Sequence, residues 1–358
     1  MKKIFTVLLM LAISLSFTGC QYKGSVNEIN IKSINYNNYP NFRSSCDLWV
    51  NNDVYLYNSD GFYNMRTFCY QNGNRVKLLE SNDFINETYG GRILPMNDFA
   101  YFSTTSGDNN QNFYKFSFPN QSYEKITTIK GYLDWIATPE YIVYIQFLNE
   151  ESSLPDLFVY IIDKDTTFTI CNDVLSFGIV DNKIRYLTSL NAHTLASFEY
   201  DHTSNISNKI GEIQVAIDNQ YPICNFTSNY TIIAKADSYD WSKITVHSFD
   251  GLSHEYRLPK PIQQFVAGEN FAYAVCYETE EYSTTSVRHK DNGIYKINLA
   301  NGSYEVIETL ADEDTEIHVV SDDEIYITQH KMNFIGQYKG HVHKMMVSNK
   351  TKTKVFVK

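Results

Sequence analysis

The sequence lacks the patterns by which metal clusters, disulfide-rich domains and common enzyme families are usually identified. Its six cysteines are scattered and include no CxxC pair, which excludes a zinc cluster or a disulfide framework as the basis of the fold. No GxSxG, HExxH, Walker A or GxGxxG pattern occurs, so no nucleophile elbow, zincin helix or nucleotide loop is indicated. Information on the fold therefore has to come from the periodicity of the apolar residues.

Positive charge is also scarce. The chain has 30 Lys and Arg against 41 Asp and Glu, a formal net charge of −11. Because nucleic-acid binding depends on Lys and Arg contacts with phosphate, we expect no nucleic-acid partner. No Pro- or Gly-rich linker divides the 358 residues, so one large domain is expected to follow the N-terminal segments.

The N-terminus has the features of an export signal. Lys2 and Lys3 precede the apolar segment 4–17, which is too short to span a bilayer as a stable helix. The following Gly19-Cys20 resembles the lipobox of bacterial lipoproteins, although Phe17 replaces the usual aliphatic residue. This resemblance implies a signal peptide over 1–19, a lipid on Cys20 and a polar tether over 20–43. An ordinary secretory signal is the alternative.

Strand-like phrases fill the rest of the chain. Aromatic residues make up 15% of the sequence, with 28 Tyr and 22 Phe, which favours pleated sheets. In segment 291–310, alternating apolar residues lead to Asn301-Gly302, and a second apolar run follows, as in a tight hairpin. The same phrase, a strand, a short polar turn and a second strand, recurs at intervals of roughly 45 residues.

Seven such units of four strands can be counted. The first turns of the units are 52–53, 97–98, 139–140, 182–183, 228–229, 269–270 and 323–324. The pattern predicts an all-β, seven-bladed β-propeller of four-stranded antiparallel blades over 44–358. Six or eight blades, a β-sandwich and two smaller β-domains are the alternatives.

The blade phrases resemble those of a known group of proteins. GIYKINLANGSYEVI and DDEIYIT are similar to the repeats of bacterial extracytoplasmic propellers of the TolB-like and low-density-lipoprotein-receptor types. The YWTD tetrapeptide of the receptor type is absent. The resemblance covers 44–358 and implies a binding or scaffolding role without an assigned reaction.

Two groups of residues are expected in the interior. Trp49 and Trp135 fall on the inner strands of their blades, where we expect core packing. Cys46 and Cys69 fall on the first and third strands of one blade. They would lie near 10 Å apart, beyond disulfide reach, so both are predicted to be free thiols.

The turns from first to second strand are short, whereas the connections from second to third strand are long. The long connections, on the opposite face, are 104–112, 148–156, 235–242, 277–292 and 329–340. Because long loops on a rigid scaffold often carry binding sites, we expect a ligand there, most of all at the irregular loop 277–292. Insertions without a ligand are the alternative.

Aromatic and basic side chains in these loops are the candidate ligand-binding residues. They can stack on sugars or grip carboxylates and phosphates. The residues are Tyr239, Trp241, Tyr282, Arg288, His289 and Tyr338.

Acidic and histidine residues give weaker signals. Loop carboxylates could form the acid and base of a glycosidase: Glu150, Glu151, Asp156, Glu278, Glu280, Glu281 and Asp291. His341 and His343 share one face of a strand and His330 lies at the start of the preceding loop, a spacing compatible with a metal. Asp312, Asp314 and Glu316 alternate but lack the glycine of a calcium loop, so we expect a solvated connection.

These observations predict a non-enzymatic, lipid-anchored protein on the outer face of a bacterial membrane. Its propeller would bind a cell-envelope protein or glycan, with no cofactor and no metal. A glycan hydrolase or lyase using loop carboxylates is the alternative.

Overall fold

The structure is a computed structural model, and it is described here over most of the chain from residue 48 onward. The described residues are 48–51, 54–60, 65–71, 74–80, 83–84, 87–96, 98–107, 110–131, 134–148, 154–191, 193–215, 222–235, 240–283, 286–310, 314–332 and 338–357. Cys20 and the segments predicted to be a signal peptide and a tether lie outside these residues. Within them, no helix is long and apolar enough to cross a membrane.

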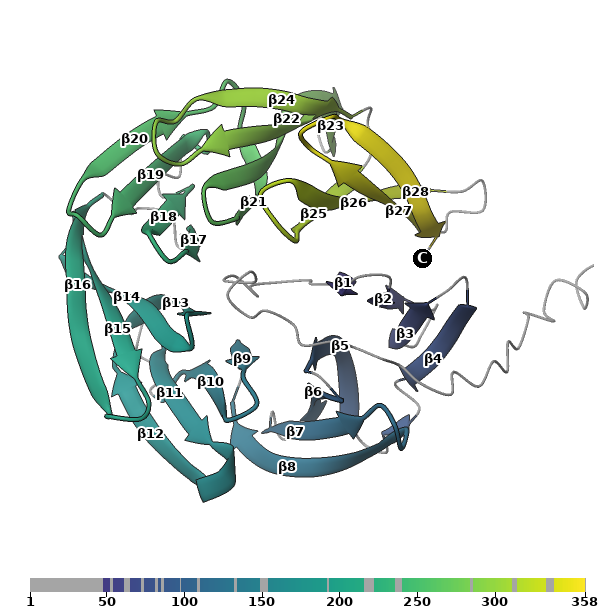
Figure 1. The fold of residues 1–358 in the computed structure, drawn as a ribbon, viewed down its shortest axis with the longest axis vertical. Coiled ribbons are helices and arrows are strands. Elements are labelled where there is room, and N and C mark those ends of the chain that lie inside the picture. Colours follow the sequence, from purple (N-terminus) through teal and green to yellow (C-terminus); the bar gives the residue numbers. More distant parts are fainter. Residues whose placement is uncertain are drawn as a thin grey trace, which may run out of the picture.

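Seven four-stranded antiparallel sheets form a ring, and each sheet consists of four consecutive strands (Figure 1). The first strand of each blade lies nearest the centre of the ring and the fourth lies at the rim. The predicted seven-bladed β-propeller is therefore confirmed. Each predicted turn between a first and a second strand also agrees with the observed strand bounds to within one residue.

The described part of blades 1 to 3 comprises twelve strands and the short 3-10 helix η3. Blade 1 comprises β1 (Leu48–Asn51), β2 (Val54–Asp60), β3 (Met65–Gln71) and β4 (Asn74–Glu80). Blade 2 comprises β5 (Glu87–Pro95), β6 (Phe99–Ser106), β7 (Asn110–Ser117) and β8 (Ser122–Lys130). Blade 3 comprises β9 (Trp135–Ala137), β10 (Tyr141–Gln146), β11 (Asp156–Ile161), η3 (Ile162–Lys164) and β12 (Thr166–Cys171).

Blades 4 to 7 repeat the arrangement. Blade 4 comprises β13 (Val174–Val180), β14 (Lys183–Asn191), β15 (Thr194–Asp201) and β16 (Ile206–Gln214). Blade 5 comprises β17 (Ile223–Phe226), β18 (Tyr230–Ala234), β19 (Lys243–Ser248) and β20 (Ser253–Arg257). Blade 6 comprises β21 (Ile262–Ala267), β22 (Phe271–Ser283), β23 (Ser286–Asn298) and β24 (Tyr304–Thr309). Blade 7 comprises β25 (Asp314–Val319), β26 (Glu324–Met332), β27 (Tyr338–Met346) and β28 (Thr351–Val357).

Local turn chemistry produces the tight hairpins. Asp181 and Asn182, between β13 and β14, both have positive φ, at 50° and 61°, as a two-residue type I′ turn requires. Gly302, between β23 and β24, has a φ of 69°, and a Cβ there would overlap the ring of Tyr256 in blade 5. Glycine is thus needed at this turn both for its backbone conformation and for the packing of two blades.

The core lies between the blades because both faces of the middle strands are covered. Ile142 and Val143, neighbours on β10 that point to opposite faces, are both fully buried. Trp135 is buried as predicted: its ring meets Phe113 edge-on at 5.0 Å, and its Nε1 donates to Ser103 Oγ at 3.1 Å. The side chain of Trp49 lies outside the described residues.

Four cysteines are described, and all are free. Cys69, Cys224 and Cys276 are buried, and Cys171 is half-buried. Burial raises the pKa of both Cys69 and Cys276 to about 12, so neither is a thiolate nucleophile at neutral pH. The prediction of a free thiol is confirmed for Cys69, whereas Cys46 lies outside the described residues.

The ring closes by packing between blades 1 and 7, without a strand shared between them among the described residues. Phe356 of β28 is the centre of this contact. Its ring centroid lies 5.4 Å from that of Tyr55, 4.7 Å from Tyr57 and 5.0 Å from Tyr70. The contacts that join the two blades here are those of the aromatic rings around Phe356 and of Tyr326 with Tyr55, whose ring centroids lie 5.8 Å apart.

Candidate functional site

The two ends of the antiparallel strands define two faces of the disc. The turns from first to second and from third to fourth strand lie on one face, which we call the turn face. The connections from second to third strand, and those between blades, lie on the other, which we call the loop face.

On the loop face, three of the predicted long loops are mainly hairpin extensions. Strand pairing continues to Thr105 and Gln111 in blade 2, and to Met332 and Tyr338 in blade 7. In blade 6, β22 and β23 run 13 residues each and pair as far as Ser283 and Ser286. The prediction of an irregular loop over 277–292 is therefore wrong. Thr279, Tyr282 and Val287 in this segment belong to residue types that favour extended pairing.

The blade 6 extension is a two-stranded ribbon. The inner strand β21 pairs with β22 only up to Cys276, and the outer strand β24 pairs with β23 only from Gly293 onward. Segments 278–283 and 286–290 consequently pair with each other alone within the described chain. The register sets Glu278 opposite Lys290 and Glu280 opposite Arg288, and opposite charges at paired positions stabilise a ladder.

Five of the six candidate ligand-binding residues fall on three consecutive blades of the loop face. Tyr282, Arg288 and His289 are ribbon positions, and Tyr338 begins β27 in blade 7. Their side chains, and all of Tyr239, lie outside the described part. Trp241 is in the blade 5 connection between β18 and β19, and its side chain is described.

Trp241 is exposed on a well-anchored loop. The side chain is 39% exposed, and the Lys235 Nζ lies 4.3 Å from the centroid of its ring. The Trp241 carbonyl accepts a hydrogen bond from the Ile262 amide at 3.0 Å, which ties this loop to the first strand of blade 6. Burial lowers the pKa of Lys235. The cation therefore lies partly out of water against the indole, where its attraction to the ring is stronger than at a fully exposed site.

Asp240 fixes the other side of this loop. Its carboxylate accepts from the Ser242 hydroxyl at 2.6 Å and pairs with Arg257 at 2.9 Å. The Ser242 hydroxyl, with the nearby positive charge, holds the pKa of Asp240 below its ordinary value. The indole is thus presented to solvent next to Asp240, whose carboxylate is paired, an arrangement suited to stacking on a ligand.

The weaker predicted sites are only partly described. Of the seven loop carboxylates, Asp156 alone has a described side chain, and its Oδ1 accepts from the Asp173 amide at 3.2 Å. In the register of β26 and β27, His341 lies opposite Gln329 and His343 lies opposite Ile327. His330 lies opposite Gly340, so it is on the other face of the sheet from His341 and His343. No group of three His, Cys, Asp or Glu suited to a metal occurs among the described residues.

Asp314 and Glu316 belong to β25, so the connection expected there is in part a strand.

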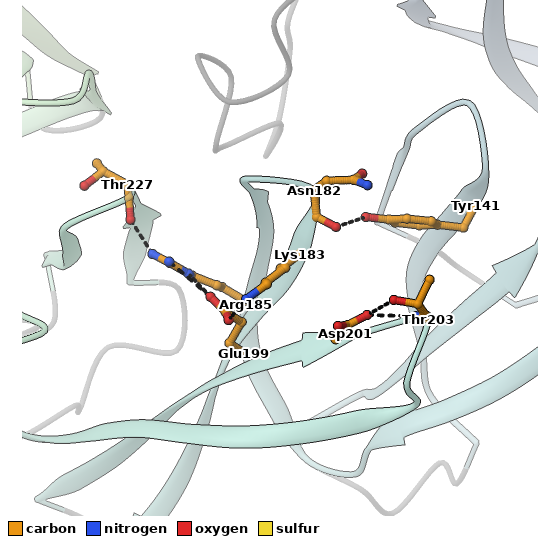
Figure 2. Close-up of polar contacts among 8 residues, drawn as sticks. All are labelled: Tyr141, Asn182, Lys183, Arg185, Glu199, Asp201, Thr203 and Thr227. Atoms are coloured by element: carbon orange, nitrogen blue, oxygen red, sulfur yellow. Dashed lines mark hydrogen bonds and ion pairs between the residues drawn. The ribbon is translucent and has the colours of Figure 1, made fainter.

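The turn face carries a charged cluster around the buried Arg185 that the sequence analysis missed (Figure 2). Arg185 of β14 pairs with Glu199 Oε2 at 3.2 Å, donates through Nη1 to the carbonyl of Thr227 in blade 5, and lies 4.3 Å from the centroid of the Phe249 ring. Lys183 pairs with the second oxygen of Glu199 at 2.6 Å. Burial opposes ionisation of Glu199, yet Lys183 and Arg185 together hold the pKa of that carboxyl below its ordinary value.

This cluster acts as a structural latch because Arg185, paired with Glu199 within blade 4, donates to the Thr227 carbonyl of blade 5. A signal for it exists in the sequence: Arg185 is a charged residue within the otherwise apolar strand phrase IRYL. A charged residue in an apolar strand phrase predicts a buried ion pair.

Comparison with known proteins identifies the architecture. No family model and no curated protein sequence matches this chain. Among solved structures, a prolyl endopeptidase matches with a TM-score of 0.63 at 8% identity, over 87% of this chain and 49% of that one. A puromycin hydrolase matches with a TM-score of 0.58 at 10% identity, over 87% and 54%. An oligogalacturonate lyase in complex with manganese matches with a TM-score of 0.53 at 7% identity, over 64% and 73%.

These similarities show the fold alone. The chain spans about half the length of the two peptidases, and the identities are at most 10%. Propellers of one architecture host many unrelated functions, so activity has to be argued from this chain's own residues.

Proposed function

We propose that this chain is a lipid-anchored binding or scaffolding protein of the bacterial envelope that takes a protein or glycan partner on its loop face. The Cys20 motif supports the anchor, and the blade 6 ribbon supports the binding role. A lipid on Cys20 would hold the propeller at the outer face of the membrane.

The ribbon is the observation that carries the binding role. An exposed strand edge is a hazard for aggregation, and proteins usually shorten or cover such edges. Here 278–290 extends beyond the four-stranded blade with both outer edges free of a further strand in the described chain. A two-stranded extension of this kind adds little to the stability of the propeller core. A binding role accounts for its length.

The partner surface would combine this ribbon with Trp241. Blades 5, 6 and 7 are neighbours in the ring (Figure 1). The aromatic platform of Trp241 and the Arg288 position therefore lie on adjacent blades of one face. The Arg288 position suits a charged grip on a glycan with acidic groups or on an acidic protein segment, and the exposed indole of Trp241 offers an apolar contact beside it.

Cross-linking in intact envelopes tests the proposal. Replacing Trp241, Tyr282 and Arg288 together by Ala should abolish the cross-linked species formed by the wild-type protein. A matched control replaces Lys164, Ser204 and Leu252, exposed residues of the turn face, and should leave that species unchanged. Unchanged cross-linking in the loop-face variant would contradict the proposal.

Two further variants separate the parts of the proposal. Cys20→Ser should release the protein from the membrane fraction if the anchor is a lipid. A ribbon shortened by replacing 279–289 with Asn-Gly should keep its far-UV circular dichroism and lose the partner, since an isolated hairpin adds little stability. Release of cleaved or unsaturated sugars from envelope glycans by the wild-type protein would favour the hydrolase or lyase alternative.

A further inference from the structure

Large apolar side chains are exposed at the tips of the loop face. Phe147 and Leu148 follow β10 in blade 3 and are 50% and 65% exposed. Leu190 near the end of β14 in blade 4 is 50% exposed, and Trp241 of blade 5 is 39% exposed. We call these four residues the apolar tips.

The distribution of such residues over the molecule is uneven. The other exposed large apolar side chains of the described chain are scattered on outer strands or lie on a turn: Tyr123, Phe168, Ile206, Leu252, Tyr304 and Val306. The apolar tips, by contrast, belong to three consecutive blades and lie at the same end of their strands. Scattered apolar residues are normal on a surface, whereas a group at one end of three neighbouring hairpins marks a contact site.

The connections that carry two of the tips are held in place by backbone hydrogen bonds. In blade 4, the Val215 amide donates to the carbonyl of His193 at the tip of the β14–β15 hairpin, at 3.0 Å. In blade 5, the Leu258 and Ile262 amides donate to the carbonyls of Ser242 and Trp241, each at 3.0 Å. These tips are fixed features, so a partner does not have to order them on binding.

The path of the chain indicates which surface they meet. Strand β1 begins at Leu48 and ends at the turn to β2, so it starts on the loop face. The segment from Cys20 therefore joins the propeller on the face that carries the apolar tips. Because few residues separate Cys20 from Leu48 in the sequence, the proposed lipid would keep that face near the membrane.

We propose that the apolar tips contact the lipid bilayer, so that the loop face lies on the membrane surface. This proposal rests on the proposed lipid anchor. Because the net charge is −11, attraction to anionic headgroups does not supply the binding energy. Insertion of Phe, Leu and Trp at the interface does, as in peripheral proteins with one lipid chain and a second apolar signal. Lys235 beside Trp241 can extend its ammonium to the headgroups.

The position of the ribbon also restricts where its partner can lie. Blade 6 adjoins blade 5, so contact of the tips with lipid brings the ribbon to the membrane surface. Its partner would then be a component of that surface rather than one far from it.

Tryptophan quenching tests the bilayer contact. The acylated protein is placed in phosphatidylethanolamine and phosphatidylglycerol vesicles with either plain or brominated acyl chains. Bromine quenches only tryptophans that reach the hydrocarbon, and the Trp241→Phe variant reports the emission of Trp49 and Trp135 alone. We expect weaker emission in the brominated vesicles for the wild-type protein, and equal emission in both for Trp241→Phe. The triple variant Phe147→Ser, Leu148→Ser and Leu190→Ser should lose at least half of the quenching while keeping its circular dichroism.

The outcomes distinguish the two proposals. Flotation first shows that the wild-type protein is bound to the vesicles. Equal emission from both kinds of vesicle would then overturn the bilayer contact. In that case, cross-linking of a protein to position 241 would assign the tips to a protein partner. If mass analysis shows no lipid on Cys20, the anchor fails. The same comparison is then made with a Cys20→Ser chain that is held by an N-terminal histidine tag on nickel-chelating lipid.

Discussion

Gly211 illustrates how a single residue sets the distance between two blades. It lies on β16 of blade 4, and a Cβ there would approach His247 Nε2 of blade 5 to 2.8 Å. The His247 ring is buried and its Nδ1 lies 2.8 Å from Ser253 Oγ, so it has little freedom to move away. The glycine permits close packing rather than an unusual backbone conformation.

Gly211→Ala should therefore lower the free energy of unfolding by about 1–3 kcal/mol through overpacking. Urea denaturation monitored by circular dichroism measures the change. Gly107→Ala is the matched control, because no atom lies within 4 Å of its added Cβ. The control should change stability by less than about 0.5 kcal/mol. Equal stability of both variants would show that the blades adjust without cost.

His247 also gives the fold a pH dependence. Burial lowers its pKa, against a smaller opposing effect of Asp250. The unfolded chain then binds more protons than the folded chain as pH falls below about 6.5, so stability is present above this pH and is lost on acidification.

His247→Asn, which keeps a polar group near Ser253, should make the loss of unfolding free energy between pH 7.5 and pH 5.5 smaller than in the wild type. The measurement is urea denaturation at the two pH values. His343, whose pKa is also lowered by burial, keeps part of the dependence in the variant. An unchanged pH dependence would mean that His247 does not carry it.

At the scale of elements, the blades are connected by a recurring latch on the turn face. A polar side chain near the start of a second strand donates to a backbone carbonyl in the first turn of the next blade. The pairs are Tyr101 to Pro139, Tyr141 to Asn182, Arg185 to Thr227 and Tyr273 to Asp322. Each of these contacts gives a turn carbonyl a hydrogen-bond donor and fixes the position of one sheet relative to the next.

The charged latch should be the most costly to remove. Arg185→Met leaves the Thr227 carbonyl without its donor and Glu199 with Lys183 alone, and we expect a loss of about 3 kcal/mol in unfolding free energy. Lys183→Met is the control, since Lys183 is 46% exposed and its ion pair contributes at most about 1 kcal/mol. Denaturant titration compares the two, and equal losses would contradict a special role for Arg185.

At the scale of the whole molecule, closure of the ring is the distinctive feature. In the described chain, blades 1 and 7 meet through aromatic rings, with Phe356 among Tyr55, Tyr57 and Tyr70. The contact joins residues about 300 positions apart in sequence. It is therefore entropically costly to form and depends on well-packed side chains.

Phe356→Ala should cost about 3–5 kcal/mol, because it removes a buried ring from this junction. Phe168→Ala, on the outer strand of blade 3 and 38% exposed, should cost less than about 1 kcal/mol. Thermal and urea unfolding of both variants provide the measurement. A small effect at Phe356 would show that other contacts close the ring.

The sequence by itself determined the blades. Turn pairs such as Asn301-Gly302 and alternating strands such as that ending in Leu299 are local signals, because turn conformation and strand alternation depend on neighbours in sequence. Seven repetitions of one phrase then indicated the architecture. The length of the ribbon was misjudged because charged residues such as Glu280 and Arg288 resemble a solvated loop until their pairing register is known.

Only the tertiary structure decided how the blades meet. The contact of His247 with Gly211, the latch from Arg185 to Thr227 and the closure around Phe356 each join different blades. No local pattern encodes which residues of separate blades face one another, since that depends on the stagger and twist of complete sheets. For the same reason, the grouping of apolar tips on the face where β1 begins became visible only in three dimensions.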